Sequence, residues 1–178
     1  MDEDHGGNRK NLEALLGKAK FFEKNKKYDE CLEVLSELCV INKTFWPAQV
    51  EKAKVHISNG EWDQALEALS TVLAKDKSNV EALRIYTYYL LSRENDMELV
   101  TEKMDELMLA LQQREEKNAD LFYNISRLFA RYCGRRSEII VKTLQFMDVA
   151  LSQQPENAVY HTELGTQKSF LGDYNSAV

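Results

Sequence analysis

The feature that most constrains the fold is a short pattern that occurs three times along the chain. In each copy an aromatic residue is followed by two polar residues and then by a small one. The copies are Tyr28-Asp29-Glu30-Cys31, Trp62-Asp63-Gln64-Ala65 and Tyr174-Asn175-Ser176-Ala177. Tyr28 and Trp62 lie 34 residues apart. Such a fixed period indicates repeated supersecondary units, each packed against its neighbours.

Three segments have the composition of turns between the two helices of a repeat. They are Asn59-Gly60-Glu61, Glu94-Asn95-Asp96 and Leu171-Gly172-Asp173. Gly and Asn tolerate the left-handed backbone that often ends a helix, and an acidic residue stabilises the free N–H groups that start the next one. The period and the turn chemistry are typical of the tetratricopeptide repeat (TPR), a pair of antiparallel helices. The sequence therefore predicts an all-α TPR solenoid that coils as a right-handed superhelix.

The amino-acid composition favours an all-helical chain. Only 7 Gly and 2 Pro occur among 178 residues, too few for a β protein with frequent tight turns. Strong helix formers such as Leu, Ala, Glu and Lys are abundant. An ordinary antiparallel helical bundle shares this apolar spacing and remains the alternative fold.

The repeat pattern divides the chain into about four and a half helical hairpins. We expect a long second helix in the third unit and a lengthened turn in the fourth. The predicted parts are a polar tail at 1–11, units at 12–45, 46–79, 80–117 and 118–156, and a truncated fifth unit at 157–178. Because the fifth unit stops inside its second helix, we expect the chain to be a fragment of a longer repeat protein.

Charge and motif content argue against several classes of function. The net charge is -6 and no block of Lys and Arg stands out, so nucleic-acid binding is not expected. Cys31, Cys39 and Cys133 are irregularly spaced, and no histidine has a second ligand residue three or four positions on, so no metal site is expected. No nucleotide-binding or nucleophile motif occurs, so we expect neither catalysis nor a cofactor. The acidic N-terminus and the lack of long apolar runs predict a cytoplasmic protein without direct membrane insertion.

First helices line the concave side of a TPR coil, where partners usually bind. One TPR subclass holds the C-terminal carboxylate of chaperones with Lys and Asn side chains from three consecutive first helices. The corresponding positions here are Leu16, Lys20, Glu51, Glu81 and Ile85. The negative charge of Glu51 would repel a carboxylate, so this clamp is not expected.

Two pairs of residues are candidates for contact with a protein partner. Arg84 and Tyr88 lie on the first helix of the third unit, and Tyr and Arg are enriched at binding hot spots. We expect Tyr88 to point outward, with a position at the edge of the core as the alternative. Arg127 and Arg131 share one face of a helix in the fourth unit and suit an acidic partner segment, with a merely solvated face as the alternative.

Several segments outside the general TPR pattern resemble one family. They are 79–84, 119–125, 133–135 and 162–165, in this order and spacing. Together they make the chain similar, over 12–178, to the tetratricopeptide repeat protein 21 family, the long TPR subunit of intraflagellar transport complex A.

The resemblance implies a non-catalytic scaffold that contacts other complex A subunits and cargo, in the cytoplasm, the cilium and the ciliary base. It further implies a role in retrograde ciliary transport and in the entry of membrane cargo into cilia. A generic cytosolic TPR adaptor that binds a peptide in its concave groove is the alternative function.

Overall fold

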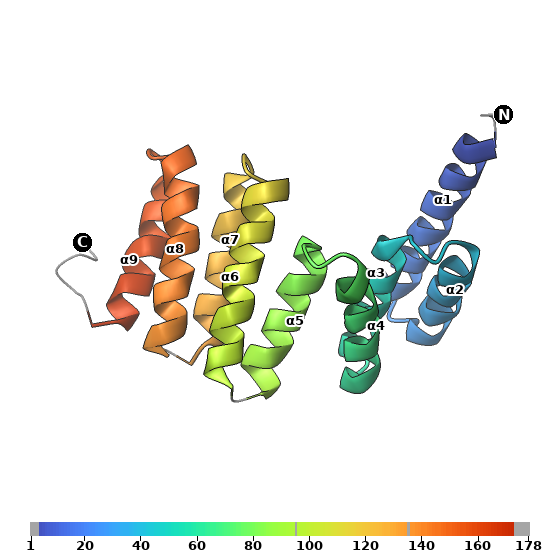
Figure 1. Cartoon of the computed structure of the whole chain (residues 1–178), viewed down its shortest axis with the longest axis horizontal. Coiled ribbons are helices and arrows are strands. Elements are labelled where there is room, and N and C mark those ends of the chain that lie inside the picture. Colours follow the sequence, from blue (N-terminus) through green and yellow to red (C-terminus); the bar gives the residue numbers. More distant parts are fainter. Residues whose placement is uncertain (1–3, 95, 135, 173–178) are drawn as a thin grey trace. The chain divides into compact units, whose positions relative to one another are not determined.

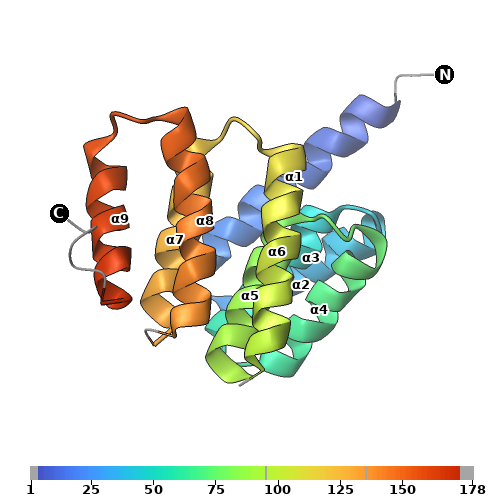
Figure 2. The same ribbon diagram turned by 60° about the vertical axis from the view of Figure 1, so that its left-hand side comes forward.

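The computed structural model describes residues 4–94, 96–134 and 136–172, with side chains from residue 11 onward. In these ranges the chain forms nine helices and no strand (Figures 1 and 2). They are α1 (Asp4–Lys24), α2 (Tyr28–Ile41), α3 (Trp46–Ser58), α4 (Trp62–Lys75), α5 (Val80–Arg93), α6 (Met97–Arg114), α7 (Ala119–Tyr132), α8 (Ser137–Gln153) and α9 (Ala158–Phe170). None of the helices, over the described residues, is both long and apolar enough to cross a membrane.

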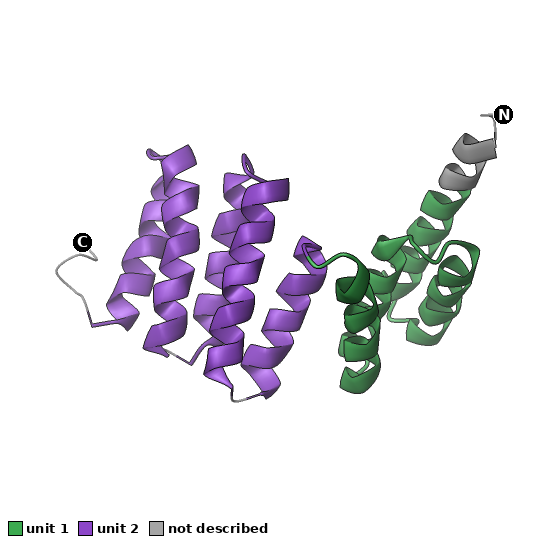
Figure 3. Ribbon diagram, viewed as in Figure 1, with its two compact units in different colours: residues 1–77 green, residues 78–178 purple. Residues whose placement is uncertain are grey.

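The helices fall into two compact units (Figure 3). Unit 1 is Met1–Lys77 and holds α1 to α4; unit 2 is Ser78–Val178 and holds α5 to α9. In unit 1 each helix packs against the next, whereas in unit 2 α5 packs against α6, α6 against α8, and α8 against both α7 and α9. The prediction of an all-α TPR solenoid is confirmed, whereas the right-handed superhelical course stays a prediction.

In unit 1, small residues bring the first two helices close together. Ala19 on α1 and Cys31 on α2 are each 1% exposed, and the Cys31 thiol donates a hydrogen bond of 3.1 Å to the Ala19 carbonyl. Leu35, Leu38 and Val55 are fully buried in the same cluster. Cys31 occupies the small position of the repeated motif, so the motif corresponds to a real close approach of two helices.

The turn between α3 and α4 has the geometry expected from its sequence. Gly60 has a φ of 82°, and the N–H of Glu61 donates to the carbonyl of His56 at 2.8 Å, which ends the helix. The turn after α1 reaches the same left-handed conformation without glycine, because Lys26 has a φ of 58°. The sequence patterns gave no sign of the Lys26 conformation.

In unit 2 the helices form two layers. Helices α5, α7 and α9 make one layer, α6 and α8 make the other, and α7 packs closely against α8. The core between them contains fully buried side chains such as Phe122, Phe129, Phe146, Met104 and Leu107. This arrangement places the outer sides of α5, α7 and α9 on one surface of the unit.

The helix bounds bear on the predicted division into repeats without deciding it. α1 begins at Asp4, inside the segment 1–11 that the sequence treats as a polar tail. Asn95 and the motif at 174–177 lie outside the described residues, as does the second helix expected in the fifth unit. The boundaries of the predicted helical repeats therefore stay a prediction.

Candidate protein-binding face

In unit 2, the helices α5 and α7, each the first helix of a repeat, begin next to residues that cap them. The Asn79 side chain accepts a hydrogen bond of 3.1 Å from the backbone N–H of Ala82 at the start of α5. Asn118 accepts one of 3.2 Å from the N–H of Leu121 at the start of α7. These caps fix where each helix begins, and the apolar face that each helix buries determines which side chains lie opposite the core.

All four predicted candidates lie in this layer, two on α5 and two on α7. Arg84 and Tyr88 are four residues apart on α5, and Arg127 and Arg131 are four residues apart on α7, so each pair shares one helix face. Arg84, Tyr88 and Arg127 are partly exposed, and Arg131 is exposed. We call the surface formed by Tyr88, Arg127, Arg131 and Tyr132 the tyrosine–arginine face.

Tyr88 contacts an aromatic residue of the neighbouring helix. Its ring meets that of Tyr132, at the end of α7, edge to face, with centroids 5.1 Å apart and an interplanar angle of 90°. Burial, with a smaller contribution from Tyr132, raises the pKa of Tyr88 above its ordinary value. Tyr132 is 54% exposed and Tyr88 is partly exposed, so the pair offers aromatic surface that a partner could contact. The sequence reasoning missed Tyr132, although its place beside Arg131 could have indicated it.

Arg84 already has a carboxylate partner. Its Nε and Nη2 donate to the two carboxylate oxygens of Glu81, at 2.8 and 2.7 Å. The hydrogen bonds with Glu81 raise the pKa of Arg84 above its ordinary value. The positive charge of Arg84 is therefore offset within α5, and its role as a partner contact stays a prediction.

The two arginines of α7 differ from Arg84 in this respect. Among the described residues, no carboxylate pairs with Arg127 or Arg131. Both lie on α7, where Tyr132 directly follows Arg131, and they carry two positive charges without compensation. A guanidinium group is well suited to binding a carboxylate through two parallel hydrogen bonds.

Two side-chain contacts hold α7, which carries the two arginines, against α9. The rings of Tyr123 and Tyr160 stack with centroids 4.8 Å apart. The Tyr160 hydroxyl donates to an Asp120 oxygen at 2.5 Å, and burial together with Asp120 raises the pKa of Tyr160 to about 12. Asp120 is therefore occupied by Tyr160.

Two fully buried polar side chains, Ser126 and Gln167, join α7 and α9 to each other and to the backbone of α8. The Ser126 hydroxyl lies 2.8 Å from the Thr143 carbonyl, to which it donates, and Nε2 of Gln167 donates to Ser126 Oγ at 2.9 Å. Gln167 Nε2 also donates to Glu163 at 3.0 Å. These hydrogen bonds fix how α9 is rotated against α7. The sequence reasoning missed them; polar residues at positions where helical spacing expects apolar ones were the only available signal.

The histidine and acidic side chains of unit 1 have local structural roles. His56 Nδ1 lies 2.6 Å from Glu61 Oε2, and Asn59 donates to the other oxygen of that carboxylate at 2.6 Å. Glu51, at a position of the chaperone clamp, lies 3.2 Å from Lys54 and 3.9 Å from Lys20. In the described part of the chain, no three His, Cys, Asp or Glu side chains are grouped to hold a metal ion.

Two models of one protein family match the sequence. The model described as "Tetratricopeptide repeat protein 21 N-terminal ARM repeat" matches residues 2–66, and "Tetratricopeptide repeat protein 21 second ARM domain" matches residues 102–178. The chain is 38% identical over 165 residues to tetratricopeptide repeat protein 21B of Homo sapiens and 31% identical over 164 residues to tetratricopeptide repeat protein 21A of the same species. These matches cover 93% and 88% of this chain, but it spans only 12% of each relative.

Solved structures of repeat proteins share the fold. PilW, a type IV pilus biogenesis factor, superposes with a TM-score of 0.68 at 14% identity, covering 93% of this chain and 72% of PilW. MamA from Desulfovibrio magneticus RS-1 gives a TM-score of 0.62 at 16% identity, covering 93% of this chain and 88% of MamA. At such low identity the likeness supports the fold alone.

Proposed function

Because the chain belongs to the tetratricopeptide repeat protein 21 family, a family of repeat scaffolds that bind other proteins, we propose that it acts in intraflagellar transport complex A. In this proposal it is a non-catalytic section of the long TPR subunit. It holds other subunits, and possible cargo, in the cytoplasm, at the ciliary base and in the cilium. Its role is in retrograde ciliary transport, cargo entry and cilium biogenesis.

The observation that carries the binding mode is the uncompensated positive charge on α7. Arg127 and Arg131 have no carboxylate partner among the described residues, and Tyr132, which contacts Tyr88, directly follows Arg131 on α7. An acidic partner segment gains charge-assisted hydrogen bonds from the arginines and apolar contact from the tyrosine rings. Since all four side chains stand on packed helices, little backbone entropy is lost when the partner binds.

The experiment is affinity purification from ciliated cells, with the bound proteins quantified by mass spectrometry. The tagged wild-type chain is compared with Arg127→Glu/Arg131→Glu and with a control, Lys43→Glu/Lys117→Glu. Lys43 and Lys117 are exposed, and the control changes the net charge by the same amount. We expect complex A subunits with the wild type and the control, and about a tenfold lower yield with the arginine variant.

Two results would contradict different parts of the proposal. Recovery of chaperones in place of transport subunits would favour the generic cytosolic adaptor and remove the assignment to complex A. Equal recovery of complex A subunits by the arginine variant and the control would keep the assignment but exclude the tyrosine–arginine face as the contact.

A further inference from the structure

A groove lies in the other layer of unit 2, between the first turns of α6 and α8. The two helices run in the same direction, because Lys142 contacts Asp105 and Gln153 contacts Glu116 with the same sequence separation of 37 residues. Their N-terminal ends therefore lie side by side and enclose a space of about 460 Å³. The lining side chains include Met97, Glu98 and Thr101 from α6 and Glu138, Val141 and Lys142 from α8.

The groove offers an apolar side chain to water. Val141 is 48% exposed, although its neighbours on α8, Ile139 and Ile140, are fully buried in the core. Met97 is half-buried at the start of α6. Covering Val141 and Met97 with a partner's apolar side chain would remove both from water, which is favourable.

The charge around Val141 and Met97 is negative. Glu98 and Glu138 line the groove, are exposed, and form no ion pair within the part of the chain that the structure describes. The one cation in the described lining, Lys142, is held by both oxygens of Asp105 at 2.5 and 2.7 Å. Its charge is therefore offset before any ligand arrives.

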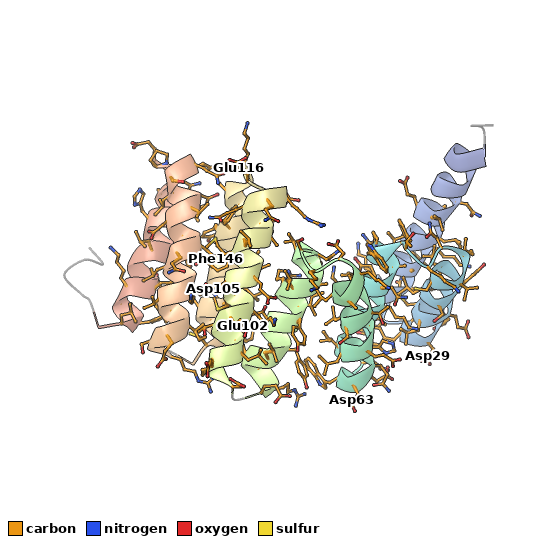
Figure 4. All side chains as sticks on the ribbon, viewed as in Figure 1. Asp29, Asp63, Glu102, Asp105, Glu116 and Phe146 are labelled. Atoms are coloured by element: carbon orange, nitrogen blue, oxygen red, sulfur yellow. The ribbon has the colours of Figure 1, made fainter. Side chains whose placement is uncertain are left out.

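The next turn of α6 adds to this negative charge. Glu102 is 62% exposed, and Figure 4 shows Glu102 and Asp105 along α6 on the side that faces the viewer. Lys103 lies 2.7 Å from Glu106 and 3.5 Å from Glu102, so its positive charge is offset too.

From these features we infer that the α6–α8 groove binds a basic segment of a partner protein, in which Lys or Arg residues flank an apolar side chain. The apolar side chain lies on Val141 and Met97, and the flanking cations pair with Glu98 and Glu138. A second copy of this chain fits less well, because its net charge is -6. The inference does not depend on the assignment to complex A, since it concerns the opposite layer from the tyrosine–arginine face.

The test uses the full chain and a phage-displayed library of random peptides, followed by synthesis of the most enriched sequence. We expect enriched peptides to carry Lys or Arg on both sides of an apolar residue. Binding of the labelled synthetic peptide, followed by fluorescence anisotropy, should weaken about fivefold or more in Val141→Asn and in Glu98→Lys, and further at high salt.

The matched control is Glu116→Lys. This exposed residue follows α6 at its opposite end, about 27 Å from Glu98 along the helix direction. The control makes the same charge change as Glu98→Lys and should leave the affinity unchanged. Circular dichroism of each variant checks that the helices are intact, which the exposure of Val141 and Glu98 leads us to expect.

Several results would overturn the inference. They are the absence of enriched peptides, enrichment of acidic peptides, or an affinity that Val141→Asn and Glu98→Lys leave unchanged. Sedimentation would overturn it in another way, if the chain self-associates and Val141→Asn abolishes that association, because the occupant would then be a second copy.

Discussion

Replacing Ser126 by alanine tests whether the buried hydrogen bonds between α7, α8 and α9 stabilise unit 2. The change removes the acceptor of the 2.9 Å bond from Gln167 and the donor to the Thr143 carbonyl. A neutral hydrogen bond contributes about 1 kcal/mol, and a buried polar group left unpaired costs about 1–3 kcal/mol. Gln167 is fully buried and would keep only its bond to Glu163. We therefore expect the free energy of unfolding to fall by about 2–3 kcal/mol.

A second substitution separates the hydrogen bonds from the packing. Gln167→Met keeps most of the side-chain volume and leaves Ser126 bonded to the Thr143 carbonyl, so it should cost about 1 kcal/mol. In the double variant no polar group of the Ser126–Gln167 pair is left without a partner. Its destabilisation should therefore be smaller than the sum of the two single changes by about 1–2 kcal/mol.

The assay is urea unfolding followed by two signals. Far-ultraviolet circular dichroism follows all helices, whereas tryptophan fluorescence follows unit 1, because Trp46 and Trp62 both lie there. The variants should change the dichroism transition much more than the fluorescence transition. Single-variant effects that add within about 0.5 kcal/mol would refute the hydrogen-bonded coupling of Ser126 and Gln167.

Three further predictions concern unit 1. Gly60→Ala should lower the free energy of unfolding by about 1 kcal/mol in the fluorescence assay, because Gly60 has a φ of 82° and an added Cβ meets no atom within 4 Å, so only backbone strain acts. Hydrogen bonds from His56 and Asn59 lower the pKa of Glu61 in the folded protein. Glu61 should therefore stabilise the fold fully above its ordinary pKa of 4.5, and this contribution should be lost as the pH falls through the lower folded pKa. The variant Glu61→Gln should lose less stability over this range, and an equal loss would show that the pKa of Glu61 is not lowered by folding. Burial raises the pKa of Cys31 to about 11, so the native protein should alkylate at Cys31 far more slowly than in urea by mass spectrometry, and equal rates would refute its burial.

The repeated motif made much of unit 1 predictable, because it marks helix starts directly. Tyr28 and Trp62 are the first residues of α2 and α4, and Gly60 has the left-handed backbone that the turn required. Neither α7 nor α8 begins with the repeated motif, and both were expected from apolar spacing alone. Apolar spacing identifies a helix and its buried face, but it does not say which helix covers that face.

The candidate site was predictable only residue by residue. Helical spacing placed Arg127 and Arg131 on one face, which needs no knowledge of neighbouring helices. The contact of Tyr88 with Tyr132 joins residues of two helices, and the bond from Gln167 to Ser126 joins residues 41 positions apart. Both depend on the rotation and offset of one helix against the next, which side-chain packing determines and sequence periodicity does not.

The hydrogen bond between Gln167 and Ser126 has a consequence for the surface that α9 carries. A purely apolar contact lets a helix turn slightly about its axis at little cost, whereas a directional bond from α9 to Ser126 on α7 permits a narrow range of angles. Glu163 lies on α9 itself, so its bond holds the Gln167 side chain in place for this contact. One buried hydrogen bond between helices therefore determines which side chains of α9 a partner would meet.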